Sequence, residues 1–351
     1  MLLLEDNSCT NDLLPFSAIR SVLDIRMGIL TLREKWALLL GVKGFASVGM
    51  TKGPALPANL LPTRALAAVV REELERGPLS QDAVGRLMVH GRLVRYPWHI
   101  FQHNSEALIE DFSLVTAGRK SLPIPPSVQT SGDMGIFIEP GARLSHCILN
   151  AETGPIYIGP GAEIMEGALI RGPFACCEGA VVKMGAKIYG ATTLGPFCTA
   201  GGELKNAVLL GYSNKGHDGY LGDAVIGEWC NLGAGTSASN VKNNAGIVSV
   251  FHPASGTWLP AGQKCGLLMG DYSRSAINTA FHTGTMTGIC CNIFGAGSPP
   301  KYIPDFSWGQ DGQTRYEWDK ALRDIRNWKK MKAGDMKDEE IKTLRHIFEQ
   351  F

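Results

Sequence analysis

The central part of the chain carries apolar or small side chains at a strict spacing of six residues. The series runs without a slip through Ile158, Ile164, Ile170, Cys176, Val182, Ile188, Leu194 and Ala200. An α-helix would repeat its apolar positions every 3.6 residues, and a single strand would repeat them every two. A period of six indicates short extended runs separated by turns, each run sending one side chain into a shared core. Small residues four positions later, such as Ala162 and Ala168, fit the tight corners. The pattern predicts a hexapeptide parallel β-helix.

The same frame returns on both sides of this stretch after short shifts. Before it lie Ile138 and Leu144; after it come Val208, Tyr220, Ile226 and Leu232, and then a looser run of Met269, Phe281 and Ile293 beyond an insert near residues 240–265. We therefore predict a mainly β protein whose β-helix spans residues 135–298. Glycine-rich hexapeptide prisms are usually left-handed, against the right-handed rule for ordinary crossovers, but composition alone does not establish the hand.

The regions on either side of the β-helix differ from it in composition and in hydrophobic pattern. Residues 1–117 predict a small α/β domain, and the Pro/Ser/Gly-rich residues 118–134 predict a linker. The domain's expected elements are a short strand at 2–4 and helices at 29–40, 66–75 and 97–112. Residues 299–351 predict an extended segment and two charged helices, 315–332 and 337–351. The stripe Trp318, Leu322, Ile325 and Trp328 is typical of a helix packed on the prism or a neighbouring subunit rather than of a cofactor site.

Composition narrows the function classes. The 34 Lys and Arg residues balance 33 Asp and Glu residues, so the chain carries no field for nucleic acid or a membrane surface. No apolar run reaches transmembrane length, and MLLLEDN is too short for a signal peptide. The nine cysteines include no CxxC pair, which favours reduced thiols and a cytoplasmic protein.

Metal and nucleotide motifs are not found in the sequence. The prism histidines are scattered, and His99 and His103 lack the glutamate of an HExxH site, so we predict no metal ligands. Neither GxxxxGK[ST] nor GxGxxG occurs in a suitable position. Arg20, Arg26 and Arg33 are candidates for phosphate contacts, with an ordinary position on a helix surface as the alternative.

The polar stretch 202–240 interrupts the repeat and gathers groups with chemical capacity. His217 lies in a Lys-Gly-His-Asp-Gly loop, and nearby are Glu203, Lys205, Tyr220, Asn231 and Asn240. A neutral imidazole can take the proton as an amine attacks, and a carboxylate can fix its tautomer. Amide donors can hold a thioester oxygen, while lysine and tyrosine can hold an anionic acceptor. The grouping suits transfer of an acyl group to an amine.

This stretch resembles the acetyltransferase half of the GlmU-like family, which joins glucosamine-1-phosphate acetyltransferase and N-acetylglucosamine-1-phosphate uridylyltransferase. The resemblance lies in Glu203-x-Lys205-x-Ala207, in Ser213, His217 and Tyr220–Ala224, in Asn231 and Gly233–Thr236, and in Asn240. It implies a left-handed prism that forms a trimer and binds acetyl-CoA between subunits. It also implies His217 as base, oriented by Glu203, and the backbone of Ala234 placing the acetyl group. Lys205, Tyr220, Asn231 and Asn240 would hold the sugar phosphate.

The opening residues 11–36 resemble a shortened uridylyltransferase half of a less common bacterial branch of this family. There are departures from the family pattern. Cys176 stands where the family has a phosphate-binding arginine, with Lys183 as a candidate substitute, and Asn240 is followed by Val-Lys-Asn-Asn rather than Tyr-Asp-Gly. Ser21 replaces a proline. The glycine-rich loop and metal-binding aspartate of the uridylyltransferase are not recognisable, so Mg²⁺ and UTP or another NTP are expected only if the N-terminal half is active.

The leading hypothesis is therefore an acetyl-CoA-dependent N-acetyltransferase for an amino-sugar phosphate, most simply glucosamine 1-phosphate. The alternative is a non-catalytic trimer that binds sugar nucleotides or serves as a scaffold.

Overall fold

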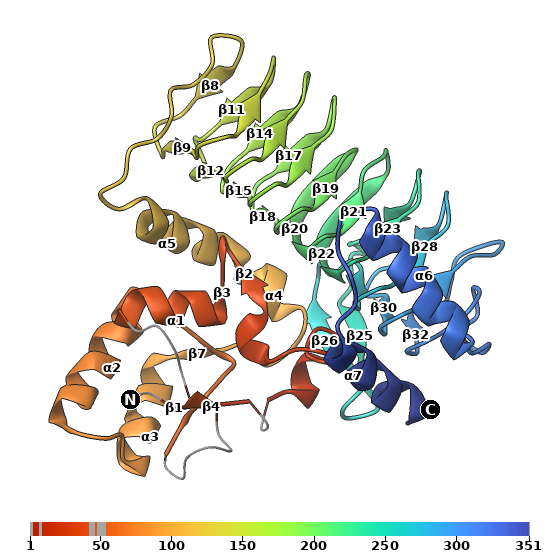
Figure 1. The fold of residues 1–351 in the computed structure, drawn as a ribbon, viewed down its shortest axis with the longest axis horizontal. Helices are drawn as coiled ribbons and strands as arrows, with labels where there is room; N and C mark the ends of the chain where they lie inside the picture. Colours follow the sequence, from red (N-terminus) through yellow and green to blue (C-terminus); the bar gives the residue numbers. More distant parts are fainter. Residues whose placement is uncertain (1–2, 7–8, 42–45, 48–53, 351) are drawn as a thin grey trace.

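The computed structural model describes residues 3–6, 9–41, 46–47 and 54–350. Its main body is a prism of about ten turns of parallel β-strands, which confirms the β-helix predicted from the period of six. The prism runs diagonally through Figure 1, with the N-terminal domain along one side and the C-terminal helices α6 (Trp318–Lys330) and α7 (Asp338–Glu349) near its far end.

The strands form three faces, each a ladder of parallel pairs. Face 1 contains β8 (Gln129–Ser131), β11 (Ile148–Asn150), β14 (Leu169–Arg171), β17 (Lys187–Tyr189), the first halves of β20 (Glu203–Gly211) and β22 (Tyr220–Glu228), β24 (Ser237–Ala238) and β29 (Ala280–Phe281). Face 2 contains β9 (Ile136–Ile138), β12 (Ile156–Ile158), β15 (Phe174–Cys176), β18 (Thr192–Leu194), the second halves of β20 and β22, β27 (Leu268–Met269), β30 (Met286–Thr287) and β32 (Tyr302–Ile303). Face 3 contains β10 (Arg143–Leu144), β13 (Glu163–Ile164), β16 (Val181–Val182), β19 (Thr199–Ala200), β21 (Asn214–Lys215), β23 (Asn231–Leu232), β28 (Arg274–Ser275) and β31 (Asn292–Ile293).

The interior of the prism is filled by the residues that define the repeat. All eight apolar positions from Ile158 to Ala200 are buried in one core, as are the small residues Ala162, Ala168, Ala180, Ala186 and Cys198. The prism begins at Gln129, inside the segment expected to be a linker, and its last strand ends at Ile303.

Two predicted interior positions were wrong by one residue. Leu209 and Leu221 fill the core, while Val208 and Tyr220 face outward. The reason is that β20 and β22 run through a corner without a separate turn. In each strand the corner is a single residue in the left-handed conformation, Asn206 or Asp223, so the sequence frame slips there.

The N-terminal domain is small. A parallel sheet joins β1 (Leu3–Glu5), β4 (Ala46–Ser47) and β5 (Leu56–Pro57), and two short antiparallel pairs join β2 (Arg26–Met27) to β3 (Leu30–Thr31) and β6 (Leu60–Leu61) to β7 (Arg92–Leu93). Around them pack α1 (Leu32–Leu40), α2 (Arg64–Arg76), α3 (Gln81–His90), α4 (His99–Gln102) and α5 (Asn104–Thr116), with single 3₁₀ turns at Asn11–Leu13 and Val22–Asp24.

Several helix boundaries differ from the prediction. The first helix starts at Leu32 because Thr31 forms a capping box with Glu34, so Ile29 and Leu30 stay outside it. The third predicted helix is broken at His103 into α4 and α5, and α3 was not predicted. The strand expected at 2–4 is present as β1, and Leu2 lies outside the described residues.

The N-terminal domain covers face 2. Outward side chains of that face, such as Val208 and Val225, share a core with helices α1 to α4, and α5 packs on Phe137 and Tyr157. Asn104, at the start of α5, has no exposed surface. Its side-chain Oδ1 accepts a hydrogen bond from Gly28 N, and its Nδ2 donates hydrogen bonds to Ala191 O and Thr193 Oγ1. The hairpin of β25 (Val248–His252) and β26 (Thr257–Gly262), within the insert predicted at 240–265, reaches back to this domain through a bond from Gln102 Nε2 to Ala261 O.

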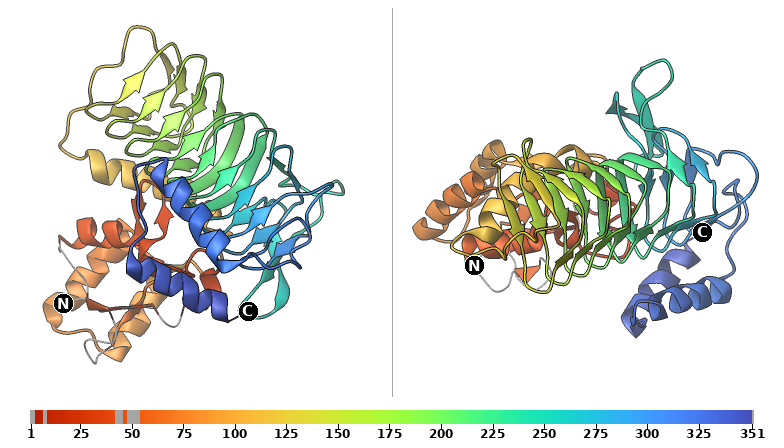
Figure 2. Two further views of the ribbon diagram at one scale, coloured as in Figure 1. Left: turned by 45° about the vertical axis from the view of Figure 1, so that its right-hand side comes forward. Right: turned by 90° about the horizontal axis from the view of Figure 1, so that it is seen from above.

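The C-terminal helices cover the corner between faces 2 and 3 (Figure 2). At this corner Phe197, Tyr212 and Trp229 stack on successive turns, with ring centroids 5.2 and 4.3 Å apart. Ala321 and Ile325 of α6 and Leu344 of α7 are buried in the same cluster as Trp229. This confirms that the helix stripe is a packing surface on the prism. None of the helices among the described residues is both long and apolar enough to cross a membrane.

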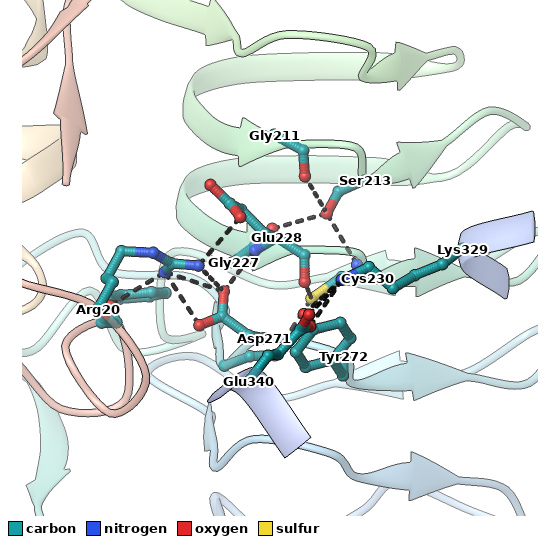
Figure 3. A network of polar contacts seen from close by, with 12 residues as sticks. Arg20, Gly211, Ser213, Gly227, Glu228, Cys230, Asp271, Tyr272, Lys329 and Glu340 are labelled. Atoms are coloured by element: carbon teal, nitrogen blue, oxygen red, sulfur yellow. Dashed lines mark hydrogen bonds and ion pairs between the residues drawn. The ribbon is translucent and has the colours of Figure 1, made fainter. Parts of the chain in front are cut away.

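A buried polar network joins the three parts of the chain (Figure 3). Arg20, from the N-terminal segment, pairs with Asp271 at 2.9 Å and Glu228 at 3.2 Å, both on prism turns. On the other side of this corner, Lys329 of α6 pairs with Glu340 of α7 at 2.6 Å, and Tyr272 also contacts Glu340. The Arg20 side chain is 10% exposed and the Asp271 side chain is fully buried. Arg20 therefore acts as a structural clamp.

We expect Arg20→Met to destabilise the protein by about 3–5 kcal/mol, because it leaves the buried Asp271 carboxylate without its cation. Urea unfolding followed by fluorescence measures this change. The control is Arg95→Met, which removes an exposed arginine of the same domain and should change stability by less than about 0.5 kcal/mol. Equal unfolding midpoints for Arg20→Met and the parent would contradict the assigned clamp.

Candidate functional site

The N-terminal domain and the C-terminal helices leave face 1 open. Large apolar side chains remain exposed on it, including Ile148 (41%), Leu169 (45%) and Tyr189 (41%). These residues line a shallow hollow of about 260 Å³ together with Arg171 and Lys187. Further along the same face, the exposed side chains become polar and include the residues predicted to form the site.

Glu203 and Lys205 both point outward from β20, on either side of the buried Leu204. Parallel pairing aligns Glu203 with Lys187 on the preceding turn and with Tyr220 on the following one. The next row aligns Tyr189, Lys205 and Gly222. Five side chains that can contact a polar ligand thus share two neighbouring rows of one face.

Tyr220 folds along the face rather than away from it. A Cβ atom at Gly222 would lie 2.2 Å from the Tyr220 hydroxyl oxygen, so a side chain at residue 222 would displace the ring. Partial burial, helped by the carboxylates of Asp223 and Glu203, raises the pKa of Tyr220. The hydroxyl therefore stays protonated at neutral pH and can donate a hydrogen bond to an anionic ligand.

His217 lies at the corner between faces 3 and 1. Its loop connects β21 to β22, and its side chain is exposed. The amide of Glu203 donates to Gly219 O at 3.1 Å, which ties β20 to this loop. On the following turn, Gly235 N donates to Asp218 O at 3.1 Å, so the Ala234–Gly235 corner lies directly beside the histidine loop. In the part of the chain that the structure describes, no hydrogen bond joins the imidazole of His217 to Glu203.

Of the two predicted asparagines, Asn231 lies away from this group, whereas the side chain of Asn240 hydrogen-bonds with Tyr220. Asn231 points outward from β23 on face 3, where its Oδ1 is 3.5 Å from Asn214 Nδ2. Asn240 lies beyond β24, where its Nδ2 donates to Asp223 Oδ2 at 2.5 Å, and Asn206 donates to the other oxygen of that carboxylate at 2.7 Å. One chain thus brings Glu203, Lys205, Tyr220, His217, Ala234 and Asn240 near one another and leaves Asn231 on face 3.

The residue that stands in place of the family's phosphate-binding arginine lies inside the prism. Cys176 has no exposed surface and belongs to the interior core. Lys183 is exposed on the turn after β16. Besides Lys205, face 1 carries the cations Arg171 and Lys187, which sequence reasoning missed. Their signal was available: each lies one residue from an interior isoleucine of the repeat, Ile170 or Ile188, and must therefore point outward.

The described residues contain no group of three or more His, Cys, Asp or Glu side chains that could hold a metal ion. His99 and His103 instead contact each other edge to face at 5.4 Å, and burial lowers the pKa of both. All nine cysteines lie in the described residues, free and buried. Burial raises the pKa of their thiols, to about 11 for Cys177 and about 12 for Cys198.

The N-terminal cations considered for phosphate are engaged within the chain. Arg20 is in the clamp with Asp271, Arg26 contacts Ile29 O and Glu34, and Arg33 pairs with Asp24 at 2.6 Å. The alternative interpretation placed these arginines on helix surfaces, but Arg20 lies outside the helices that the structure describes.

Comparisons with known proteins give distant similarities. A family model described as sugar nucleotidyl transferase matches residues 1–56. The bifunctional protein GlmU of Bartonella quintana (strain Toulouse) is 27% identical over 164 residues, which are 39% of this chain and 32% of that protein. The GlmU of Sphingopyxis alaskensis is 39% identical over 93 residues, 24% of this chain and 20% of that protein. The chain thus covers about a third or less of these relatives' lengths, and the predicted resemblance to GlmU-like proteins is confirmed.

Among solved structures, the polySia specific acetyltransferase NeuO matches with 14% identity and a TM-score of 0.24. The match covers 59% of this chain and 96% of that one. A superposition of this quality carries no argument about function.

Asp223 offers a test of the corner that holds Asn240. We expect Asp223→Ala to lower the free energy of unfolding by about 1–3 kcal/mol, because the amide donors of Asn206 and Asn240 lose their shared acceptor. Thermal unfolding compared with Asp133→Ala, which removes an exposed carboxylate of the same prism, measures the effect. A melting temperature for Asp223→Ala equal to that of the control would mean that the carboxylate does not hold the corner.

Proposed function

We propose, from the similarity of this chain to bifunctional GlmU proteins, that its β-helix is an acetyl-CoA-dependent N-acetyltransferase. The acceptor is an amino-sugar phosphate, with glucosamine 1-phosphate as the preferred substrate, and the protein is cytoplasmic. The observation that carries the proposal is the proximity of the exposed His217 loop to Glu203, Lys205 and Tyr220. Acyl transfer to the amine of a sugar phosphate uses a base, a carboxylate that orients the base, a cation for the phosphate and a hydroxyl donor.

The reaction proceeds by direct attack. The amine nitrogen of the sugar attacks the thioester carbonyl carbon, the new C–N bond forms, and the C–S bond breaks. His217 takes a proton from the nitrogen and returns it to the sulfur of CoA, so the products are the N-acetyl sugar phosphate and CoA thiol. Glu203 sets the tautomer of the imidazole, and the backbone at Ala234 helps to hold the acetyl group.

An acyl-enzyme through cysteine is disfavoured. A thiol must ionise to act as a nucleophile, and every cysteine of this chain is buried with a raised pKa. This supports a single transfer step in which the amine is the only nucleophile.

The sugar phosphate would lie on face 1. Lys205 supplies positive charge, and Lys187 on the adjacent strand replaces in function the arginine that Cys176 cannot provide. The hydroxyl group of Tyr220 donates a hydrogen bond to a phosphate oxygen. Asn240 lies beside Tyr220 in the same chain. Asn231 joins this pocket from a neighbouring copy in a homotrimer, which would also cover the exposed Ile148 and Leu169 and bind acetyl-CoA between subunits.

We expect His217→Ala to reduce the rate of CoA release from acetyl-CoA and glucosamine 1-phosphate by about 10²–10⁴, because it removes the general base. A thiol-reactive dye measures the released CoA. His146→Ala is the matched control, since His146 is exposed at the equivalent corner of an earlier turn, and it should retain the parent rate. Equal rates for His217→Ala and the parent would keep the activity and reject the assigned base.

The family match over residues 1–56 favours a second candidate activity, sugar-phosphate nucleotidyl transfer in the N-terminal domain. The described residues of this domain do not offer a set of metal ligands for Mg²⁺. In addition, Lys35 is paired with Asp111, as the three arginines are paired with other carboxylates. We therefore infer that this domain has kept the docking role and not the transfer.

We expect no pyrophosphate release from UTP and N-acetylglucosamine 1-phosphate in the presence of Mg²⁺, under conditions in which the same preparation releases CoA. A coupled pyrophosphatase assay makes this measurement. Sustained pyrophosphate release would assign nucleotidyl transfer to the chain. If neither CoA nor pyrophosphate is released while the protein binds a sugar nucleotide, the non-catalytic alternative holds.

A further inference from the structure

Lys215 is a lysine in the interior of the prism. It follows Asn214 in β21 and aligns with Ala200 of the preceding turn, at a position where the repeat places an apolar side chain. Lys215 has no exposed surface. Burying an ammonium group is costly unless hydrogen bonds compensate for the lost water. The prism must therefore supply partners for it.

Three backbone carbonyls surround the Lys215 ammonium group. Its Nζ donates to His217 O, to Asp218 O at 3.2 Å and to Gly201 O at 3.4 Å. An ammonium group has three N–H donors and no acceptor, so three carbonyls match it in number. Two of these carbonyls belong to the histidine loop, and the third belongs to the corner of the preceding turn, two residues before Glu203.

We propose that Lys215 is a positioning residue, whose ammonium group fixes the His217 loop against the corner that leads into Glu203. This inference rests on the proposed acetyl transfer for its functional consequence. Lys215 does not contact a substrate in this arrangement. It acts through the backbone of His217 and Asp218, which sets the direction from which the imidazole approaches the face.

The fixing depends on charge. Burial lowers the pKa of Lys215 from 10.5 to about 8, while the nearby Asp218 carboxylate opposes this change. The other titratable groups of the neighbourhood are His217 in the loop itself and Glu203 on β20, whose amide is bonded to Gly219 O. Above pH 8 the amine keeps two N–H donors and turns a lone pair toward one of the three carbonyls, so the loop loses a contact.

The direction of the Lys215 pKa shift distinguishes loosening of the loop from unfolding of the chain. The folded-state pKa of Lys215 lies below its ordinary value, so the charged form costs the folded state free energy. Loss of the proton between about pH 8 and 10.5 therefore favours the folded chain with respect to this group. Alkaline pH should disturb the histidine loop without destabilising the prism through Lys215.

The activity test compares Lys215→Met with the parent and with Lys264→Met, which removes an exposed lysine outside the proposed site. We expect kcat for CoA release to fall about 10- to 100-fold in Lys215→Met, with KM for both substrates within about twofold, because positioning of the base is lost and not substrate binding. We also expect the parent and Lys264→Met to lose activity above pH 8, and this alkaline limb to be missing in Lys215→Met. An unchanged kcat, or the same alkaline limb in Lys215→Met, would overturn the inference.

A second measurement does not depend on the proposed activity. The chemical shift of the His217 Hε1 proton, identified by its loss from the NMR spectrum of His217→Ala, should change in a step near pH 8 in the parent, where Lys215 loses its proton. A parent spectrum without this step would overturn the role of Lys215, even if Lys215→Met does not fold. If the parent releases no CoA but shows the step near pH 8, the proposed function fails and the coupling of Lys215 to His217 stands.

Discussion

The packing of the other parts of the chain depends on the geometry of the corners in each turn of the prism. Each turn must reverse direction at three corners while sending an apolar side chain inward from each face, and stacking requires that the corners of successive turns coincide. The outward side chains then form straight rows along each face. Because a row can be apolar, aromatic or polar independently of the interior, the same repeat carries a docking surface on face 2, a helix-binding corner beside face 3 and a polar site on face 1.

The attachments to the prism combine apolar burial with a small number of buried polar contacts. Apolar packing alone would allow the N-terminal domain to slide along the rows of face 2, since successive turns present similar surfaces. Asn104 and Arg20 remove this freedom, because each finds its full set of partners only at one turn. A shift by one turn would leave a buried amide or guanidinium without partners, at a cost comparable to a large part of the stability of a domain. These contacts fix the register of docking.

The sequence was most informative where the repeat was strict. The series from Ile158 to Ala200 placed every interior residue correctly, and the position of each face followed from it. It failed at β20 and β22, because a corner made by one left-handed Asn206 or Asp223 leaves no turn motif to count from. It also gave no sign that Arg20 meets Asp271, since the two residues are 251 positions apart. The role of Lys215 depends on its side chain pointing into the interior of the prism, and this became clear only when the pairing of β21 with the preceding turn was known.

The distribution of the candidate residues argues that the site is shared between copies of the chain. Glu203, Lys205 and Tyr220 lie on face 1 with Asn240 beside Tyr220, whereas Asn231 lies on face 3. Outward side chains on different faces of one prism diverge, so they cannot converge on a single small ligand. They can do so if the face 3 side of one prism packs against face 1 of another. Such packing would also bury the exposed apolar row that precedes Glu203 and would place the His217 corner, the most exposed part of the group, in the groove between the copies. The proposed trimer is therefore a condition for the proposed chemistry, because only an assembly can bring the predicted residues to one substrate.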